Sequence, residues 1–392
     1  MSGKIKALWL TSWYPNELDA MNGDFIQRHA YAASLFADIT VIHAEPDIHQ
    51  KMSNKVSVSG NGQLKEIICY FPIAKGPSFI AKMRTGIGYK KLMKTQVQKF
   101  IAENGLPDIV HVHVPIKAGL IALWLKKKYH IPYVVTEHWA IYNEVAKDKF
   151  ADRNFIFKTY TKKILKNGNL FLPVSRQLGN AVNKYVTKIN FKAIPNVADT
   201  RYFHFPQQVE MANKVFTFIH VSTMKMQKNP QGIIHAFSIF IQKHPNSKLI
   251  MVGEHFEPIE QYATSLGIPP ENIEFTGLLS YTEVASKMQM ADALLLFSRF
   301  ENLPCVIIEA LCCGLPVIST NVGGIAELIN ERNGVLIENE DEQSLIQYMQ
   351  ELYLNTLNFN REKISKDACE KYNYQTIGGE IFRTYETIIK RK

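Results

Sequence analysis

The sequence lacks the patterns that mark several common functional classes. It has no run of about 18 uncharged apolar residues, the length a membrane-spanning helix needs. Its N-terminal apolar stretch has no small-residue cleavage site, so we interpret it as a first strand and not as a signal peptide. We therefore expect a cytoplasmic protein, soluble or at most peripheral on the inner face of the membrane.

Nucleotide-loop and hydrolase signatures are missing too. No GxxxxGK followed by Ser or Thr occurs, and no GxGxxG follows the first apolar run, which argues against nucleoside triphosphatases and dinucleotide-dependent dehydrogenases. GxSxG and HExxH are also absent, which removes the commonest hydrolase signatures.

Cysteine is scarce and unpaired in pattern. The five cysteines are an odd number without CxxC spacing, and no His or Cys pairs with zinc-ligand spacing accompany them. Cys312 and Cys313 lie within an apolar run, so we expect buried, reduced side chains that act as small hydrophobic residues. We predict neither a structural metal nor a bound cofactor.

Positive charge is abundant, and it is unevenly distributed. The 392 residues, too many for one comfortable core, carry a net charge of +9. Residues 1–199 contain 28 basic and 14 acidic side chains, whereas the remainder contains 17 and 22. One half of the protein is therefore expected to meet an anionic partner.

Short apolar runs alternate with segments of helical period along the whole chain. The predicted strands of the first half are 6–11, 39–44, 65–71, 109–114, 132–136 and 170–174, and the same alternation continues in the second half. Such alternation predicts parallel sheets covered by helices. We expect two facing, doubly wound, Rossmann-like α/β domains, residues 1–198 and 199–372, separated in a segment interrupted by Pro195 and Pro206.

The densest motif, DALLLFSRFENLPCVIIEALCCGLPVIST, predicts a strand, a turn and a helix. Pro304 suits the first helical position, and Gly314 is expected to end the helix. The N-terminus of such a helix suits an anion. The candidate diphosphate donors are the backbone amides of Asn302, Leu303 and Cys305.

Two carboxylates flank the start of this helix. Glu301 precedes it, and Glu309 lies on an otherwise apolar stretch, where a carboxylate needs hydrogen-bond donors. A ribose diol would supply two. The alternative for Glu309 is a buried side chain satisfied by backbone amides or a lysine.

A second strand–turn–helix unit, FTFIHVSTMKMQKNPQ, carries Lys225 and Lys228 in its turn. Asn229 is expected to cap the following helix, with Pro230 in its first turn. Cations beside a helix N-terminus would stabilise a phosphate leaving group. The alternative is a pair of solvated lysines.

The first domain offers candidates at strand ends. Gly23, in the turn after the first strand, allows close backbone approach to a ligand, and Asp24 is expected to cap the next helix. Strand alternation places His111 and His113 on one face, with His113 nearest the strand end, and His138 ends the next strand. Each histidine could equally be structural.

Together these blocks resemble the family-4 retaining glycosyltransferases of GT-B fold. The most specific match is the segment from Glu301 to Glu309 with the following GLPVIST and GG residues. The lysine turn, AIPNVAD, DIVHVH and the Gly23 turn support it in the same order along the chain. The resemblance implies that a C-terminal helix, about 373–392, packs back on the first domain.

The resemblance also implies roles for individual residues. His113 would lie against the donor sugar, Glu301 would contact sugar hydroxyls, and Lys228 would bind the diphosphate. Further positions follow: Glu309 would bind the ribose, Gly23 the diphosphate or the acceptor, and His138 lies on the acceptor side. Thr223 stands where the family usually has an arginine, and Lys225 is a candidate second cation.

We therefore expect transfer of a hexose-type sugar from a nucleoside diphosphate sugar to a glycan or lipid-linked hydroxyl, without a metal ion. The alternatives are a sugar-nucleotide epimerase or hydrolase on the same fold and a non-catalytic nucleotide-sugar-binding subunit. The segment 75–99 is charged only by Lys and Arg and is interleaved with apolar residues, which suits an anionic membrane surface. No nucleic-acid-binding module accompanies this charge.

Overall fold

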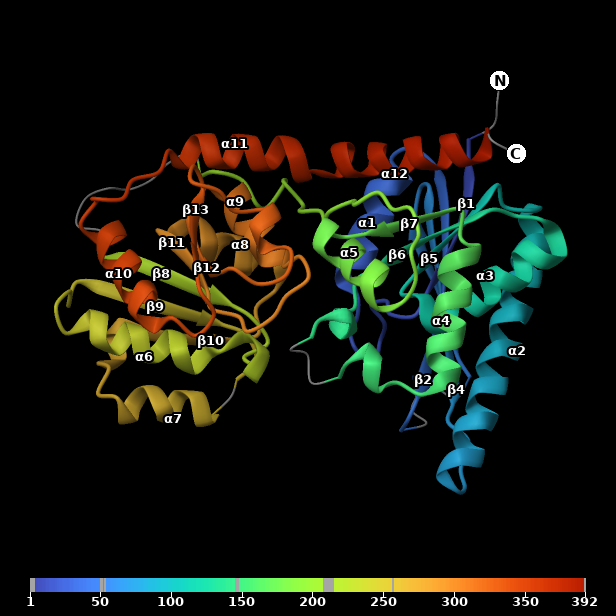
Figure 1. Cartoon of the computed structure of the whole chain (residues 1–392), viewed down its shortest axis with the longest axis horizontal. Helices are drawn as coiled ribbons and strands as arrows, with labels where there is room; N and C mark the ends of the chain where they lie inside the picture. The colour runs from blue at the N-terminus through green and yellow to red at the C-terminus, as the bar shows by residue number, and fades with distance from the viewer. Residues whose placement is uncertain are drawn as a thin grey trace. The chain divides into compact units, whose positions relative to one another are not determined.

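The computed structural model describes residues 4–390 except 50, 51, 53, 145–147, 207–214 and 256. The chain divides into two compact units (Figure 1). Unit 1 comprises residues 1–142, 148–197 and 374–392, and unit 2 comprises residues 143–147 and 198–373. We expected the domain boundary within residues 192–208, of which 207 and 208 lie outside the described part. So do residues 391 and 392, the end of the predicted C-terminal helix.

Unit 1 is built on one seven-stranded sheet in the order β3-β4-β2-β1-β5-β6-β7. Its strands are β1 (Lys6–Thr11), β2 (Asp38–Asp47), β3 (Val56–Asn61), β4 (Leu64–Pro72), β5 (Ile109–His113), β6 (Tyr133–Glu137) and β7 (Leu170–Pro173). Six strands are parallel, but β3 pairs antiparallel with β4 at the sheet edge. We did not predict β3, because VSVSGN is too polar to read as a buried strand. An edge strand needs no second apolar face.

Helices cover both faces of this sheet (Figure 1). The helices of unit 1 are α1 (Asp24–Ser34), α2 (Ser78–Asn104), α3 (Pro115–Tyr129), α4 (Phe155–Asn167), α5 (Arg176–Tyr185) and α12 (Tyr374–Ile389), with two short 3-10 turns, η1 (Ala140–Tyr142) and η2 (Phe150–Asp152). On one face α1 packs against α12, and on the other α3 lies between α2 and α4. The last helix of the chain thus completes the first unit.

The packing of α12 on α1 is close. Ile377, Ile381 and Tyr385 of α12 are buried in the same core cluster as Ala30 and Ala33 of α1. Small residues allow this approach: a Cβ atom on Gly378 would lie 2.0 Å from the carbonyl oxygen of Ala32. The apolar faces of both helices are therefore buried against each other.

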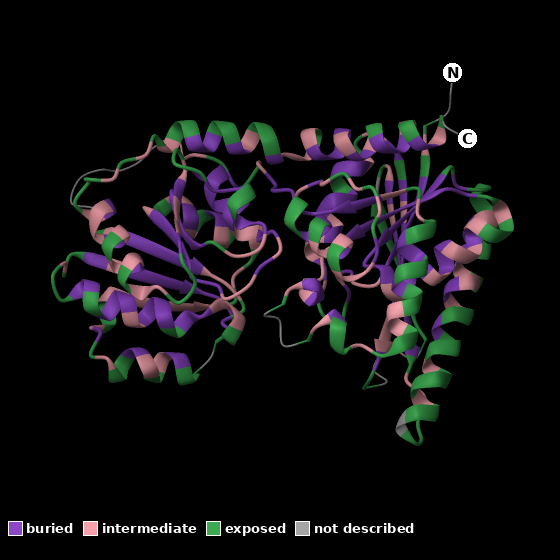
Figure 2. Cartoon of the chain, viewed as in Figure 1, coloured by how far each residue is buried: buried purple, intermediate pink, exposed green. Residues whose placement is uncertain are grey.

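Unit 2 holds a wholly parallel six-stranded sheet in the order β10-β9-β8-β11-β12-β13. Its strands are β8 (Phe216–Val221), β9 (Ser247–Val252), β10 (Ile273–Gly277), β11 (Ala293–Leu296), β12 (Val317–Thr320) and β13 (Gly334–Ile337). The helices are α6 (Pro230–Ile241), α7 (Glu257–Ser265), α8 (Tyr281–Met290), α9 (Cys305–Cys312), α10 (Glu342–Tyr353) and α11 (Arg361–Tyr372), with 3-10 turns η3 (Met226–Lys228), η4 (Pro270–Asn272) and η5 (Ile325–Glu327). The four central strands, β8, β9, β11 and β12, are mostly buried, whereas the edge strand β10 is only partly buried along its whole length (Figure 2).

Both units are doubly wound α/β domains, as predicted. In such sheets ligands bind beyond the carboxyl ends of the strands, where the strand order reverses. The order reverses beside β1 in unit 1 and beside β8 in unit 2. The predicted functional residues follow those strands and their neighbours.

Candidate active site

The turn between β11 and α9 carries Glu301 in a buried position, with its side chain 7% exposed. Pro304 is the N-cap of α9 and not, as we predicted, its first helical residue. Its ψ of 125° is extended, so the helix begins one residue later, at Cys305. The helix ends at Cys312 with Cys313 as its C-cap, and Gly314 follows with a φ of +76°, a left-handed position that glycine fills without strain.

Two glycines hold this turn close to the chain that follows β12. The amide of Gly324 donates to the carbonyl oxygen of Asn302 over 2.7 Å. Gly323 has a φ of +58°, and a Cβ atom there would lie 1.9 Å from the carbonyl oxygen of Glu301. Position 323 therefore requires glycine, because the backbone that carries Glu301 leaves no room there for a side chain.

The lysine turn contacts this glutamate directly. Lys228 Nζ donates to Glu301 Oε1 over 2.5 Å, and both side chains are largely buried. A charge-assisted pair of this kind fixes the position of both groups. Two residues predicted from separate motifs thus meet in one site.

Further contacts join the same two turns. The amide of Arg299 donates to the carbonyl oxygen of Gln227 over 2.8 Å, and the Gln227 side chain donates to the Phe300 carbonyl over 2.8 Å. The Arg299 guanidinium contacts Glu340 Oε1 and the Met226 carbonyl at 2.5 Å each. We did not single out Arg299, because a lone arginine at the end of a strand carries no sequence signal of its partners.

The start of the lysine turn is ordered by a buried histidine. His220 Nδ1 lies 2.9 Å from the Leu295 carbonyl oxygen, and its Nε2 lies 2.8 Å from Ser222 Oγ, which in turn accepts from the Met224 amide over 3.0 Å. Burial lowers the pKa of His220 to about 4, so the ring is neutral at pH 7. Thr223 and Lys225, by contrast, are exposed.

Glu309 is buried on α9, four residues and about one turn after the first helical residue, Cys305. Its Oε1 accepts from the hydroxyl of Tyr281, the first residue of α8, over 3.3 Å. Asn229 caps α6, and its side chain accepts from the Gly232 amide, with Pro230 at the helix start as predicted. A small pocket at the carboxyl ends of β8, β9 and β10 adds Met224, Gly253, His255 and Phe275, among others.

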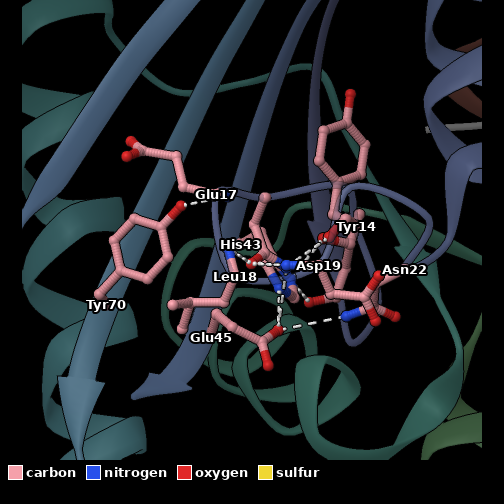
Figure 3. Close-up of polar contacts among 10 residues, drawn as sticks. Tyr14, Glu17, Leu18, Asp19, Asn22, His43, Glu45 and Tyr70 are labelled. Atoms are coloured by element: carbon pink, nitrogen blue, oxygen red, sulfur yellow. Dashed lines mark hydrogen bonds and ion pairs between the residues drawn. The ribbon is translucent and has the colours of Figure 1, made fainter. Parts of the chain in front are cut away.

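In unit 1, the turn after β1 is held by polar contacts to neighbouring strand ends (Figure 3). Glu45 Oε2 accepts from Asn22 over 3.3 Å and lies 2.9 Å from His43 Nε2, while the Tyr70 hydroxyl accepts from the Glu17 amide over 2.8 Å. No sequence pattern indicated these partners, which come from β2 and β4.

That turn ends at Gly23, which is the N-cap of α1 with a φ of +69°. A Cβ atom on Gly23 would lie 2.9 Å from the Trp13 backbone, so the site requires glycine. Asp24 does not cap the helix as we expected. It is the first helical residue, and it pairs with Arg28 over 2.8 Å in the next turn.

His113, the last residue of β5, lies in a cluster of aromatic rings. Its ring stacks on Trp9 at 4.2 Å and lies 4.2 Å from the His111 ring, so the two histidines share a face as predicted. His111 is occupied structurally, at 2.6 Å from the Tyr385 hydroxyl of α12 and 2.7 Å from Thr136 Oγ1. Among the described residues, Nε2 of His113 has no hydrogen-bond partner although it is buried.

The backbone beside His113 is strained. Val114 has a φ of +61°, which is a genuine outlier for a β-branched residue. The conformation is held because Ser12 donates from its amide to the His113 carbonyl over 3.1 Å and from its hydroxyl to the Val114 carbonyl over 2.9 Å. Burial, with its three neighbouring histidines, lowers the pKa of His113 well below 6.5, so its ring is neutral at pH 7.

His138 lies beside His113, with its Nε2 3.4 Å from His113 Nδ1. The preceding Glu137 is buried and accepts from the amides of His138 and Trp139 and from the Tyr142 hydroxyl, at 2.8–2.9 Å. Desolvation outweighs these bonds and raises the pKa of Glu137 to about 7. We did not predict a role for Glu137, since its burial depends on η1.

Two features are absent from the part of the chain that the structure describes. Within them, no three or more His, Cys, Asp or Glu side chains are grouped so as to hold a metal ion. None of the helices in the described ranges combines the length and apolarity that crossing a bilayer requires.

Comparison with known families assigns both halves of the chain. Residues 203–374 match the family described as "Glycosyl transferases group 1", and residues 59–202 match "Glycosyltransferase Family 4". The chain belongs to the family-4 glycosyltransferases. The Lys228–Glu301 pair and Glu309 lie in the segment matched by the first description, and His113 in that matched by the second.

Relatives of this glycosyltransferase include sugar-transferring enzymes of several pathways. It is 23% identical to the putative teichuronic acid biosynthesis glycosyltransferase TuaC of Bacillus subtilis, over 98% of this chain and 99% of that protein. It is 27% identical to the N-acetyl-alpha-D-glucosaminyl L-malate synthase of Bacillus anthracis, over 74% of this chain and 76% of the relative.

Solved structures confirm the GT-B fold. Sucrose-phosphate synthase from Thermosynechococcus elongatus superposes with a TM-score of 0.78 at 18% identity, over 99% of this chain and all of that one. HepE of Anabaena, solved in complex with UDP, gives a TM-score of 0.72 at 18% identity, over 98% and 100%. The predicted family and fold class are thus both confirmed.

Proposed function

We propose that this glycosyltransferase moves a hexose-type sugar from a nucleoside diphosphate sugar to a hydroxyl of a glycan or lipid-linked acceptor, with retention at the anomeric carbon and without a metal ion. The observation that carries the proposal is the buried Lys228–Glu301 pair at the start of α9. It sets a cation and a sugar-binding carboxylate together at one helix N-terminus.

The donor would bind in unit 2. Its diphosphate lies against Lys228 and the N-terminus of α9, near the backbone of Asn302, Leu303 and Cys305, where the helix dipole favours negative charge. Glu309 binds the ribose hydroxyls. This role suits a buried carboxylate, which needs hydrogen-bond donors and already accepts from the Tyr281 hydroxyl. When the donor enters, the Glu301 carboxylate turns from Lys228 to the sugar hydroxyls. Lys225 and Thr223, at the exposed start of the turn, contact the phosphates.

Retention of the anomeric configuration follows from the charges that develop on the sugar and on the leaving diphosphate. Departure of the diphosphate leaves an oxocarbenium-like sugar, and the acceptor hydroxyl attacks from the face that the diphosphate leaves, giving its proton to the phosphate oxygen. Lys228 and the helix N-terminus stabilise the charge growing on the diphosphate, the task that a metal ion performs in other transferases.

The acceptor side belongs to unit 1. The neutral His113 ring, with its unpartnered Nε2, would hydrogen-bond the donor sugar, and the Gly23 turn lets the diphosphate or the acceptor approach the backbone. His138 lines the acceptor side next to His113. The strained Val114 supports a functional role at this strand end, since such strain is characteristic of active sites.

Lys228→Met tests the site assignment. Removing one electrostatic donor to a developing oxyanion costs roughly 100- to 1,000-fold in rate, so transfer and donor hydrolysis should both fall by that factor. Lys248→Met is the matched control, because Lys248 pairs with Glu274 over 2.6 Å at the opposite end of the sheet. Equal activity in both variants contradicts the assignment.

Three further measurements test the donor site and the chemistry. A thermal-shift screen of nucleoside diphosphates and their sugars identifies the donor, and Glu309→Gln should reduce its stabilisation, since ligand at 100 times its Kd adds about 2.7 kcal/mol. NMR of the product with that donor gives the anomeric configuration, and an inverted product refutes retention. Activity that EDTA abolishes and magnesium restores refutes metal independence.

A further inference from the structure

One face of unit 1 is covered by three helices of a single charge sign. Lys and Arg number six on α2, four on α3 and four on α4, and the only acid on these helices is Glu103, which lies 3.9 Å from Lys99. The three helices are neighbours, since α3 packs against both α2 and α4. The positive excess of the whole chain is therefore concentrated on this face.

The same helices carry apolar side chains that are exposed to solvent and not packed in the core. Phe79 is 78% exposed, Met83 52% and Ile87 61%, and no residue from Phe79 to Gly88 is buried. Figure 2 shows this exposed half of α2 below the rest of unit 1. Buried residues of this helix, such as Met93 and Val97, begin only at Tyr89, near its middle. Packing in the core therefore does not explain the apolar side chains in the N-terminal part of α2.

The N-terminal turns of α4 repeat this pattern. Phe155 is 80% exposed, Ile156 65% and Tyr160 41%, followed by the exposed Lys162 and Lys163. We call the set Phe79, Ile80, Met83, Ile87, Phe155, Ile156 and Tyr160 the apolar edge patch. The sequence did not reveal the part on α4, because FIFKTYTKKIL has the apolar period of an ordinary packed helix.

The position of the patch on the fold matters. The helices follow the parallel strands β4 and β6 and run back along the sheet, so their N-terminal ends lie at its carboxyl edge (Figure 1). Gly23, His113 and His138 lie at or beyond the carboxyl ends of β1, β5 and β6, on that same edge. The apolar patch and the predicted acceptor residues thus lie at one edge of unit 1, and the basic face extends from that edge along the three helices.

We infer that this edge of unit 1 docks on the surface of an anionic lipid bilayer. The apolar edge patch enters the headgroup region, and the lysines of α2, α3 and α4 lie against acidic headgroups. An anionic polysaccharide would match the charge but would leave the patch exposed to water. A second copy of the chain would bring two like-charged faces together. The bilayer satisfies both features, and, resting on the proposed function, it would present a lipid-linked acceptor to the acceptor edge.

Vesicle co-sedimentation of the full chain, without nucleotide sugar, tests the inference separately from catalysis. We expect binding to phosphatidylcholine vesicles containing 30% phosphatidylglycerol at low salt, and at least tenfold weaker binding to pure phosphatidylcholine or in 0.5 M NaCl. The double variant Phe79→Ser, Met83→Ser should also bind the acidic vesicles at least tenfold more weakly.

The matched control is Leu106→Ser, Val58→Ser, which removes two apolar side chains of comparable exposure, 49% and 60%, outside the patch. It should bind like the wild type. Absence of binding to acidic vesicles at low salt overturns the inference. Equal binding to acidic vesicles by the patch variant and the control variant also overturns it. A third contrary outcome is vesicle binding that does not depend on the patch and is abolished by soluble heparin, which would indicate a polyanion as the partner. If transfer to a soluble acceptor fails while vesicle binding persists, only the proposed function is refuted.

Discussion

The two adjacent glycines of α12 allow the docking of this helix to be measured with variants of identical composition. A Cβ atom on Gly378 would lie 2.0 Å from the Ala32 carbonyl oxygen and 2.5 Å from the Ala32 carbonyl carbon, both backbone atoms of α1. On Gly379 the nearest atom would be Arg383 Nη1 at 3.4 Å, the end of a flexible side chain. The two positions therefore have opposite expected effects.

The magnitudes follow from helix propensity and packing. Replacing glycine by alanine inside a helix stabilises it by about 1 kcal/mol, and Gly379→Ala should gain most of that. Gly378→Ala gains the same amount, but it must separate α12 from α1, and overpacking costs about 1–3 kcal/mol or more. The propensity gain is common to both variants and cancels, so Gly378→Ala should be less stable than Gly379→Ala by roughly 1–3 kcal/mol, the cost of overpacking.

The assay is urea unfolding followed by tryptophan fluorescence. Trp9, Trp13, Trp124 and Trp139 are the four tryptophans of the chain and all lie in unit 1, so their emission reports on the unit that α12 completes. Equal midpoints for the two variants, or a Gly378→Ala protein more stable than the wild type, would refute the close packing of α12 on α1.

Two more outcomes follow from the site. Gly323→Ala should lower the transfer rate roughly 100-fold, the cost of displacing a catalytic group by about 1 Å, because its Cβ would lie 1.9 Å from the Glu301 carbonyl oxygen. The control is Gly267→Ala, which is also left-handed, at φ +72°, but has no atom within 4 Å of the added Cβ. It should keep its activity and lose only about 1–2 kcal/mol of stability. Unaltered transfer by Gly323→Ala would show that the turn tolerates displacement. The raised pKa of Glu137, about 7, makes its contribution to stability largest below pH 4.5 and removes it as the pH rises through 7. Glu137→Gln cannot ionise, so its stability relative to the wild type, measured by tryptophan fluorescence, should increase by about 3 kcal/mol from pH 5 to pH 8; a difference independent of pH would place the Glu137 pKa near its ordinary value.

The parallel strands were predictable because both of their faces are buried. Each of the six predicted strands of unit 1 coincides with an observed one to within a few residues; the run 6–11, for example, is β1. The missed strand, β3, is polar and lies at the edge, where periodicity is weak. Helix ends were predictable to about one residue, as Pro304 and Asp24 show, since neighbouring residues compete for a cap.

The candidate site residues also differ in how far local sequence patterns indicate them. Lys228, Glu301 and Glu309 could be singled out as candidates because glycines, prolines and apolar runs surround them in recognisable motifs. Arg299, Glu45 and Glu137 were not, because their partners come from other elements and no local pattern announces them. Likewise, only the fold distinguishes His111, fixed by Tyr385 from the far end of the chain, from His113, whose Nε2 has no partner among the described residues.

The return of α12 to unit 1 also sets an order for synthesis. Residues 198–373, the bulk of unit 2, leave the ribosome before the helix that covers α1. Until then the apolar face of α1, with Ala30 and Ala33, is exposed although almost all of unit 1 has been made. The first unit to begin folding is therefore the last to finish, and a nascent chain stalled near residue 373 carries a complete second unit behind an open first one.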